Sequence, residues 1–275
     1  MRVALLHPGE MGVTVGQTLK ASGHSVRWFS KDRSPASRAR AESAGFGVCG
    51  TPAELFQGLE AVVSVCPPGA ALEQAQWVRD SGYSGPYLDA NAVSPSTARA
   101  ISLVAGPLFV DGGIIGPPAR QPGTTRLYLS GPMAEEAAAW FAAGPLQAVT
   151  VGADPGSASA LKMCYAAYTK GLSALLLNVR ALAESEAVTP ALLEEWSLSQ
   201  AGLAQRSEIT ARGTAGKAWR FVDEMLEIAE TFESCGLPGD FHRAAADVYR
   251  RMAPLKAVTD PSLDDVLHCL LNRIR

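Results

Sequence analysis

The sequence predicts an α/β protein in which a doubly wound Rossmann-type sheet is followed by an all-helical region. Three observations support this fold class. The chain opens with a short apolar run, a glycine turn and a helical stretch, the start of a βαβ unit. Apolar runs of a few residues then alternate with helical segments as far as residue 151. Beyond residue 152 only helical spacing remains, so we expect two domains, residues 1–151 and 152–275.

The expected strands are short apolar runs, most of them flanked by glycine or proline, as is typical of buried parallel strands. They cover residues 3–6, 26–29, 61–66, 87–89, 108–110, 126–130 and 148–151. Helical segments are expected between the earlier strands, at residues 14–21, 34–44, 52–57, 71–80 and 94–104.

The second half begins with a long helix. Residues 157–187 contain no proline, and apolar side chains recur there at helical spacing, namely Leu161, Tyr165, Tyr168, Leu172, Leu176 and Val179. About 30 residues at 1.5 Å each span roughly 45 Å, so we expect a central helix with partners on several sides. Further helices are expected at residues 190–200, 217–235 and 241–252, the last two separated by a break at 236–239.

Composition excludes several classes of protein. The chain is 47% hydrophobic and 19% charged, with a net charge of −3, which argues against disorder and against a nucleic-acid partner. No apolar run approaches the roughly 18 residues of a membrane helix, and the N-terminus enters a strand directly without a signal segment. The five cysteines are odd in number and lack C-x-x-C spacing, so we expect a cytoplasmic protein without disulfides or a metal site.

The first strand leads into Pro8-Gly9-Glu10-Met11-Gly12. Gly9 would let the backbone approach a pyrophosphate, and Gly12 would let the helix pack close to the strand. The N-terminus of that helix would present free N–H groups to the phosphates. His7 stands where the first glycine of G-x-G-x-x-G is usual, so a plain strand-to-helix turn is the alternative interpretation. The βαβ context favours dinucleotide binding.

The end of the second strand indicates the choice of cofactor. An enzyme that uses NAD typically places an acidic residue there, whereas NADP needs room and positive charge for its 2′-phosphate. Ser30 holds the acidic position, and Lys31 and Arg33 follow, with Arg38 further on. These cations are alternatively solvated surface charges, and Asp32 offers them a partner within the loop. We favour NADP.

Other candidate residues follow the later strands, at the sheet edge where ligands bind. Cys66-Pro67-Pro68 forms a rigid loop beside the nucleotide, in which Cys66 is expected to be a small buried side chain. Asn91 is a candidate for positioning substrate or nicotinamide, unless it or Ser94 only caps the next helix. Residues 111–118 are expected to form a glycine-rich exit from a strand, wide enough for a ligand.

Lys162 is the most notable ionisable residue, because it lies near the start of the long helix among Ala, Leu, Met and Cys. An amine desolvated near an interdomain cleft would suit proton transfer to a carbonyl oxygen, although a snorkelling surface lysine fits the same pattern. A second polar group surrounds Trp219 and either lines that cleft or forms a solvated face: Lys217, Arg220 and Asp223. His242 and His268 have no partners at ligand spacing and are interpreted as structural.

These motifs resemble the β-hydroxyacid dehydrogenase superfamily, which includes 6-phosphogluconate dehydrogenase-like proteins and imine reductases. The resemblance covers nearly the whole chain. It rests on the Gly9-Glu10-Met11-Gly12 turn, on Gly23-His24-Ser25-Val26 before the specificity loop, and on Lys162 at the position of the family's catalytic lysine. A poorly characterised subgroup is more specifically similar, through 89–92, 112–116, 161–166 and Lys217-Ala218-Trp219-Arg220.

Three departures from the family pattern concern the substrate. Ile115 stands where the family usually has a serine, Ala166 where it has an asparagine, and Asp223 near the position of a lysine. Two polar groups that hold a hydroxy-acid carboxylate are therefore missing, which puts an ordinary 3-hydroxy acid in doubt. Tyr165 and Arg220 are the alternative groups for holding a polar substrate.

The resemblance implies an NADP-dependent oxidoreductase that moves a hydride between NADPH and a carbonyl or hydroxyl carbon of a small polar substrate. Lys162 would be the general acid and base, with Asn91, Tyr165 and Arg220 beside it. The residues expected at the cofactor are Gly9, Glu10, Met11, Gly12, Ser30, Lys31, Arg33, Cys66, Pro67, Pro68, Asn91 and Ala92. A homodimer through the helical domain is implied. The alternatives are an imine reductase, with Tyr165 as proton donor, and a catalytically silent dinucleotide-binding protein.

Overall fold

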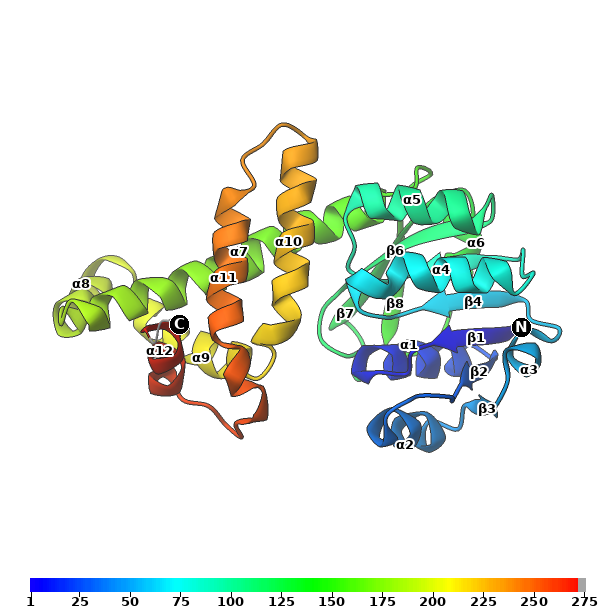
Figure 1. Ribbon diagram of the computed structural model, residues 1–275, viewed down its shortest axis with the longest axis horizontal. Helices are drawn as coiled ribbons and strands as arrows, with labels where there is room; N and C mark the ends of the chain where they lie inside the picture. The colour runs from blue at the N-terminus through cyan, green and yellow to red at the C-terminus, as the bar shows by residue number, and fades with distance from the viewer. Residues whose placement is uncertain (272–275) are drawn as a thin grey trace. The chain divides into compact units, whose positions relative to one another are not determined.

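The computed structural model describes residues 1–271. They fall into two compact units, the first spanning Met1–Met163 and the second beginning at Cys164. The first unit contains one eight-stranded sheet in the order β3-β2-β1-β4-β5-β6-β7-β8 (Figure 1). The strands are β1 (Arg2–Leu6), β2 (Ser25–Phe29), β3 (Gly47–Cys49), β4 (Ala61–Ser64), β5 (Tyr87–Asp89), β6 (Phe109–Ile115), β7 (Thr125–Ser130) and β8 (Leu146–Gly152). The six strands from β1 to β6 all pair in parallel. Strand β7 runs antiparallel to β6 and pairs in parallel with β8.

Helices cover both faces of this sheet, as the doubly wound prediction requires. They are α1 (Glu10–Ala21), α2 (Pro35–Ser43), α3 (Pro52–Phe56), α4 (Ala71–Asp80), α5 (Pro95–Ala105) and α6 (Ala134–Ala139), with a short 3₁₀ turn η1 (Pro68–Ala70) before α4. Alternate residues of β1 enter different cores: Val3 and Leu5 pack with α1, α2 and α6, while Ala4 and Leu6 pack with α3, α4 and α5.

Local sequence sets where several of these helices begin. Ser34, Thr51 and Ser94 each precede a proline and accept a hydrogen bond from the backbone N–H three residues on. A capping hydroxyl satisfies a free helical donor, and proline at the first helical position loses no helical hydrogen bond. The sequence therefore determines the starts of α2, α3 and α5.

The remaining helices are α7 (Ser157–Ser185), α8 (Thr189–Ser199), α9 (Leu203–Ala215), α10 (Ala218–Ser234), α11 (Asp240–Arg251) and α12 (Leu263–Leu271), with a 3₁₀ turn η2 (Ala253–Ala257) between the last two. Helices α10 and α11 lie side by side in Figure 1. None of the described helices is long and apolar enough to span a membrane.

The structure departs from the sequence prediction in several elements. The short edge strand β3 and the helices α6, α9 and α12 were not expected. The interpretation of residues 111–118 as a glycine-rich exit loop is wrong over 111–115, which continue β6 and pair with β7. Glycine serves close packing there, since a Cβ at Gly112 would lie 2.9 Å from the Asp89 carbonyl oxygen.

The boundary between the compact units also differs from the expected division at residue 151. Strand β8 ends at Gly152, but the first unit continues through the first turns of α7 to Met163. The buried carboxylate of Asp111 on β6 accepts hydrogen bonds from the backbone N–H groups of Gly156 (3.0 Å) and Ser159 (2.9 Å) and from the Ser159 hydroxyl (2.6 Å). These bonds fasten the N-terminus of α7 to the sheet.

Candidate functional site

The turn from β1 to α1 leaves the N-terminus of α1 open. Gly9 is the N-cap, no side chain caps the helix, and a Cβ at Gly9 would meet nothing within 4 Å. By contrast, a Cβ at Gly12 would lie 2.3 Å from the His7 carbonyl oxygen, so the close packing of turn and helix requires glycine. The backbone N–H groups of the first turn, which includes Glu10 and Met11, are therefore available to an anion. The Glu10 side chain is exposed.

The loop after β2 places Ser30, Lys31 and Arg33 in different surroundings. Ser30 is buried, and its hydroxyl donates to the Cys49 carbonyl at 3.3 Å. Lys31 is exposed, whereas Arg33 is half-buried, and burial lowers the pKa of its guanidinium. Arg38 donates to the Ser30 carbonyl at 3.2 Å, which holds a further cation at this strand end. Arg33 is thus more than a freely solvated surface charge.

Asn91 joins the ends of β4 and β5. Its Nδ2 donates to Asp89 Oδ2 at 2.8 Å and to Ser64 Oγ at 3.2 Å, and its Oδ1 accepts from the backbone N–H of Cys66. The amide is therefore held in one orientation, and it fixes the loop that continues through Pro67 and Pro68. Ser94, and not Asn91, caps α5.

Burial shifts the pKa values of two groups in this network. Complete burial, with the Asp111 charge adding to it, raises the pKa of Asp89 to about 7, although hydrogen bonds from Asn91 oppose the shift. Burial, and then the nearby Asp89, raises the pKa of the Cys66 thiol to about 12. Cys66, which is half-buried where the sequence predicted a buried side chain, therefore stays a neutral thiol near pH 7.

A pocket of about 180 Å³ opens at this edge of the sheet. Its lining comes from α1, from the ends of β4, β5 and β6, and from α7, and comprises Met11, Val65, Cys66, Ala90, Asn91, Ala92, Ile114 and Lys162. Five residues that the sequence analysis assigned to cofactor or catalysis thus line one cavity: Met11, Cys66, Asn91, Ala92 and Lys162. The ends of parallel strands are where such folds bind ligands.

The approach of α7 to β6 places Lys162 at this pocket. A Cβ at Gly113 would lie 2.7 Å from the Ala158 carbonyl oxygen and 3.0 Å from Lys162 Cβ, so only glycine allows the helix so near. Lys162 is half-buried. Asp111, one pleat earlier on β6, supplies the hydrogen bonds that hold this end of α7.

Two predicted catalytic residues belong to the second compact unit. Tyr165 lies three residues beyond Lys162 on α7 and is 49% exposed. The guanidinium carbon of Arg220, on α10, lies 5.2 Å from the centre of the Trp219 ring, and the ammonium of Lys256 lies 3.8 Å from the centre of the same ring. Lys217, Arg220 and Asp223 are all exposed, as a solvated face requires. Ile115 and Ala166 are buried and apolar.

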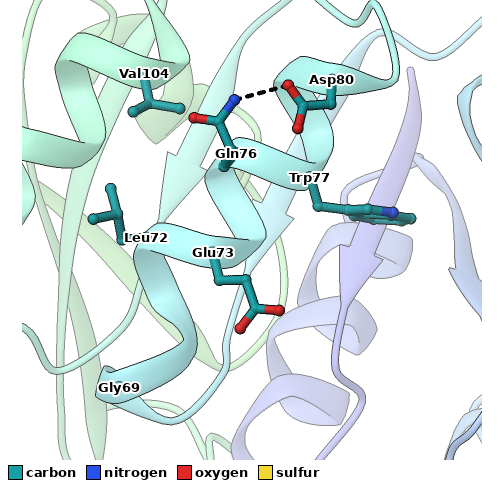
Figure 2. Close-up of a pocket in the computed structure, with 7 residues that line it drawn as sticks. All are labelled: Gly69, Leu72, Glu73, Gln76, Trp77, Asp80 and Val104. Carbon is teal, nitrogen blue, oxygen red and sulfur yellow. Dashed lines mark hydrogen bonds between the residues drawn. The ribbon is translucent and has the colours of Figure 1, made fainter.

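A second pocket lies on the exposed side of α4. Figure 2 shows its lining of Gly69, Leu72, Glu73, Gln76, Trp77, Asp80 and Val104, with the Gln76 amide donating to Asp80 at 2.8 Å. It contains none of the predicted site residues and lies on the outside of the helical layer. The pocket at Lys162, which holds five of the predicted residues, is therefore the candidate functional site.

Sequence reasoning missed the residues that organise the site: Asp89, Asp111 and Gly113. The available signal was their place in strands next to the candidate edge, since an aspartate inside a buried apolar strand needs a specific partner. Among residues 1–271, no group of three or more His, Cys, Asp or Glu side chains is arranged to hold a metal ion. His242 is buried between Phe232 and Phe241, and burial lowers its pKa.

Comparisons with known proteins cover almost the whole chain. Residues 183–252 match the domain of unknown function DUF1932. An uncharacterised 28.5 kDa protein from the 7S RNA 5′ region of Methanothermus fervidus is 31% identical over 197 residues, which are 70% of this chain and 75% of that protein. The conserved protein MTH1747, of unknown function but structurally similar to 3-hydroxyacid dehydrogenases, is 26% identical, with a TM-score of 0.66 over 94% of this chain and all of the other.

Two enzymes share the fold at lower identity. Mycobacterium tuberculosis 3-hydroxyisobutyrate dehydrogenase superposes with a TM-score of 0.72 at 17% identity, over 98% of this chain and 99% of the other. A Streptomyces aurantiacus imine reductase superposes with a TM-score of 0.53 at 20% identity, also over 98% and 99%. The chain thus belongs to one family with the Methanothermus protein, and it has the fold of the 3-hydroxyacid dehydrogenases and imine reductases that its motifs resemble.

Proposed function

We propose that this protein is an NADP-dependent oxidoreductase that transfers a hydride between NADPH and a carbonyl or hydroxyl carbon of a small polar substrate. The observation that carries the proposal is the pocket in which Lys162 and the fixed amide of Asn91 lie together, beside Met11 of the dinucleotide turn. An amine, an oriented amide and an open helix N-terminus at one sheet edge are the parts that such a reaction needs.

The residues of the turn fit a dinucleotide. The open space at Gly9 and the uncapped N-terminus of α1 would hold the pyrophosphate, with the backbone of Glu10 and Met11 donating. Ser30, Lys31 and Arg33 would hold the 2′-phosphate. The loop formed by Cys66, Pro67 and Pro68, together with Asn91 and Ala92, would border the nicotinamide ribose and ring.

A nicotinamide held there would supply or accept the hydride. Lys162 donates a proton to the forming alkoxide oxygen in reduction and accepts it in oxidation. Asn91 orients the carbonyl or the ring, because Asp89, Ser64 and the Cys66 N–H fix its amide. The apolar side chains of Val65 and Ile114 keep water from the reacting carbon.

The test is turnover and cofactor binding in Lys162→Ala and Lys162→Met. Both changes should reduce turnover about a hundredfold, as expected for loss of a general acid, while the NADPH dissociation constant stays nearly unchanged. Added methylamine should restore part of the activity of Lys162→Ala, which has room for it, and none of that of Lys162→Met. Undiminished turnover in either variant would reject the role of Lys162.

Cofactor choice has its own test. Charge-assisted hydrogen bonds from Lys31 and Arg33 to a 2′-phosphate are worth roughly 1.5–3 kcal/mol each, and Asp32 offsets part of that by pairing with the same cations. Replacing Lys31 and Arg33 together by alanine should weaken NADPH binding strongly and NADH binding little, measured by calorimetry. A wild type that binds NADH as tightly as NADPH would overturn the preference.

Imine reduction is the second candidate, because the positions of Ile115 and Ala166 offer no polar group for a hydroxy-acid carboxylate. In that reaction Tyr165, with its half-exposed ring, would donate the proton. Turnover of a panel of cyclic imines but not of ketones, with loss of activity in Tyr165→Phe, would favour it. NADPH binding without turnover on either panel would favour a silent dinucleotide-binding protein.

We also propose a cytoplasmic homodimer formed through the helical unit. Supporting it is a stripe of apolar side chains with alternating spacings of three and four residues along α7. The stripe comprises Tyr165, Tyr168, Leu172, Leu175, Val179 and Leu182, of which Tyr165, Tyr168, Leu175 and Leu182 are 49%, 68%, 46% and 62% exposed. An exposed apolar stripe with this period is typical of helix–helix association.

A further inference from the structure

His7 adopts a backbone conformation that favours glycine. Its φ is +70°, in the left-handed region, and it stands where a dinucleotide turn usually begins with glycine. The turn closes around it, with the Gly9 N–H donating to the His7 carbonyl at 2.8 Å. A residue with a large side chain costs free energy in this backbone conformation, which indicates that the side chain has a function.

The side chain of His7 lies close enough to that of Arg33 for the guanidinium charge to act on the imidazole. Nδ1 of His7 and Nε of Arg33 are both buried, and neither has a hydrogen-bond partner among the described residues. The two residues end adjacent parallel strands, since His7 follows β1 and Arg33 follows β2 by four residues. Arg40 lies against the same turn, with Nε 3.4 Å from the Pro8 carbonyl oxygen.

Burial lowers the pKa values of both His7 and Arg33. Burial, and then the Arg33 charge, lowers the pKa of His7 to about 4, although the Leu6 carbonyl acts in the opposite sense. The imidazole is therefore neutral near pH 7 and offers one N–H donor, while the guanidinium keeps its charge and five donors. Two half-buried side chains that each hold a nitrogen atom without a hydrogen-bond partner, one of them cationic, are suited to an anion that accepts several hydrogen bonds.

We propose that His7 is a specificity-determining residue that binds the 2′-phosphate of NADP together with Arg33, an inference that rests on the proposed function. The end of β2 is where the adenosine ribose of a dinucleotide lies, and His7 is next to it across the β1–β2 pair. The phosphate oxygens would accept from the imidazole N–H and, in bidentate fashion, from the guanidinium. NAD has a 2′-hydroxyl in place of this phosphate, so it would give Arg33 no anion to bind.

The test compares two probes that differ by this phosphate, 2′,5′-ADP and 5′-AMP, by calorimetry. His7→Gly should weaken 2′,5′-ADP binding about tenfold, the worth of one well-made hydrogen bond to a charged group, and change 5′-AMP binding less than about twofold. His7→Asn, which tolerates the left-handed backbone and keeps a donor, should restore part of the difference. NADPH should follow 2′,5′-ADP, and NADH should follow 5′-AMP.

Two controls separate the role of the side chain from that of the backbone. Ala187→Gly makes the same left-handed replacement at φ +56° in the second unit and should leave the affinity for both probes unchanged. His7→Gly should melt at the wild-type temperature or above, because glycine adopts φ +70° without strain. The combined His7→Gly and Arg33→Ala changes should cost less than the sum of the two single changes, since both act on one phosphate.

Equal weakening of both probes by His7→Gly, or weakening of neither, would overturn the inference. A wild type that binds 2′,5′-ADP and loses nothing in His7→Gly would reject the role of His7 alone. A wild type that binds neither probe nor NADPH would reject the proposed function and this inference together.

Discussion

At the scale of single residues, the two glycines of the dinucleotide turn differ in what a side chain would meet. A Cβ at Gly12 would collide with the His7 carbonyl oxygen at 2.3 Å, whereas a Cβ at Gly9 would meet nothing. Gly12 is therefore required by the fold itself. Gly9 is free of that requirement, so the open space beside it would matter only to a bound ligand.

Alanine at each position separates these roles. Gly12→Ala should destabilise the protein by roughly 1–3 kcal/mol through overpacking, measured by urea denaturation. Gly9→Ala should leave the free energy of unfolding within about 0.5 kcal/mol of wild type, yet weaken NADPH binding at least tenfold by filling the space for the pyrophosphate. Wild-type NADPH affinity in Gly9→Ala would contradict the placement of the pyrophosphate.

Asp89 makes a prediction about pH. Its carboxyl releases a proton near 3.8 in the unfolded chain but at about 7 in the folded protein. Between these values the folded state binds more protons, so this group's contribution to stability is complete below about pH 4 and is lost as the pH rises through 7. Asp89→Asn should therefore gain stability relative to wild type, by roughly 1–4 kcal/mol, between pH 5 and pH 8.

Urea denaturation of both proteins at several pH values measures that difference. Asn91 opposes this rise in the pKa of Asp89. Its backbone N–H donates to Asp89 Oδ1 and its side-chain amide donates to Asp89 Oδ2, and both bonds favour the ionised carboxylate. Parallel stability profiles for the two proteins over this range would show that Asp89 ionises at the same pH in the folded and unfolded states.

At the scale of elements, the contact between β6 and the start of α7 positions Lys162. Asp111 fixes the end of the helix through hydrogen bonds, and Gly113 sets how closely the helix approaches. Sequence patterns predicted both elements but not this contact, because two glycines in a row were interpreted as a loop. The pairing of β6 with β7, which no local pattern encodes, keeps them in the strand.

Gly113→Ala tests the contact. The added methyl group would press on the Ala158 carbonyl and on Lys162, so stability should fall by roughly 1–3 kcal/mol and turnover should fall while the NADPH dissociation constant stays near wild type. Gly152→Ala, at the end of β8, is the matched control, since its nearest neighbour would lie at 3.6 Å. Equal effects of the two changes would show that the close approach of α7 has no bearing on Lys162.

At the scale of the whole molecule, the proposed dimer depends on the apolar stripe of α7. Replacing Leu175 and Leu182 by aspartate places charges within an interface core and should convert a dimer to a monomer at micromolar concentration. Light scattering after size-exclusion chromatography measures the mass. Leu103→Asp on α5, where the side chain is 87% exposed, is the matched control and should stay dimeric. A wild-type monomer would reject the dimer.

The sequence by itself determined the fold class, the glycine turn between β1 and α1, and most strands and helices. Residues close together in the sequence specify these features, through apolar periodicity, capping hydroxyls before proline and the glycines of one short motif. Only the tertiary structure decided that β7 runs antiparallel to β6, that 111–115 form a strand, and that α7 begins within the first compact unit. It also brought His7 to Arg33 and Asn91 to Asp89 and Cys66. The reason is physical: strand pairing and buried hydrogen bonds join residues distant in sequence, and their energies depend on neighbours that no local pattern contains.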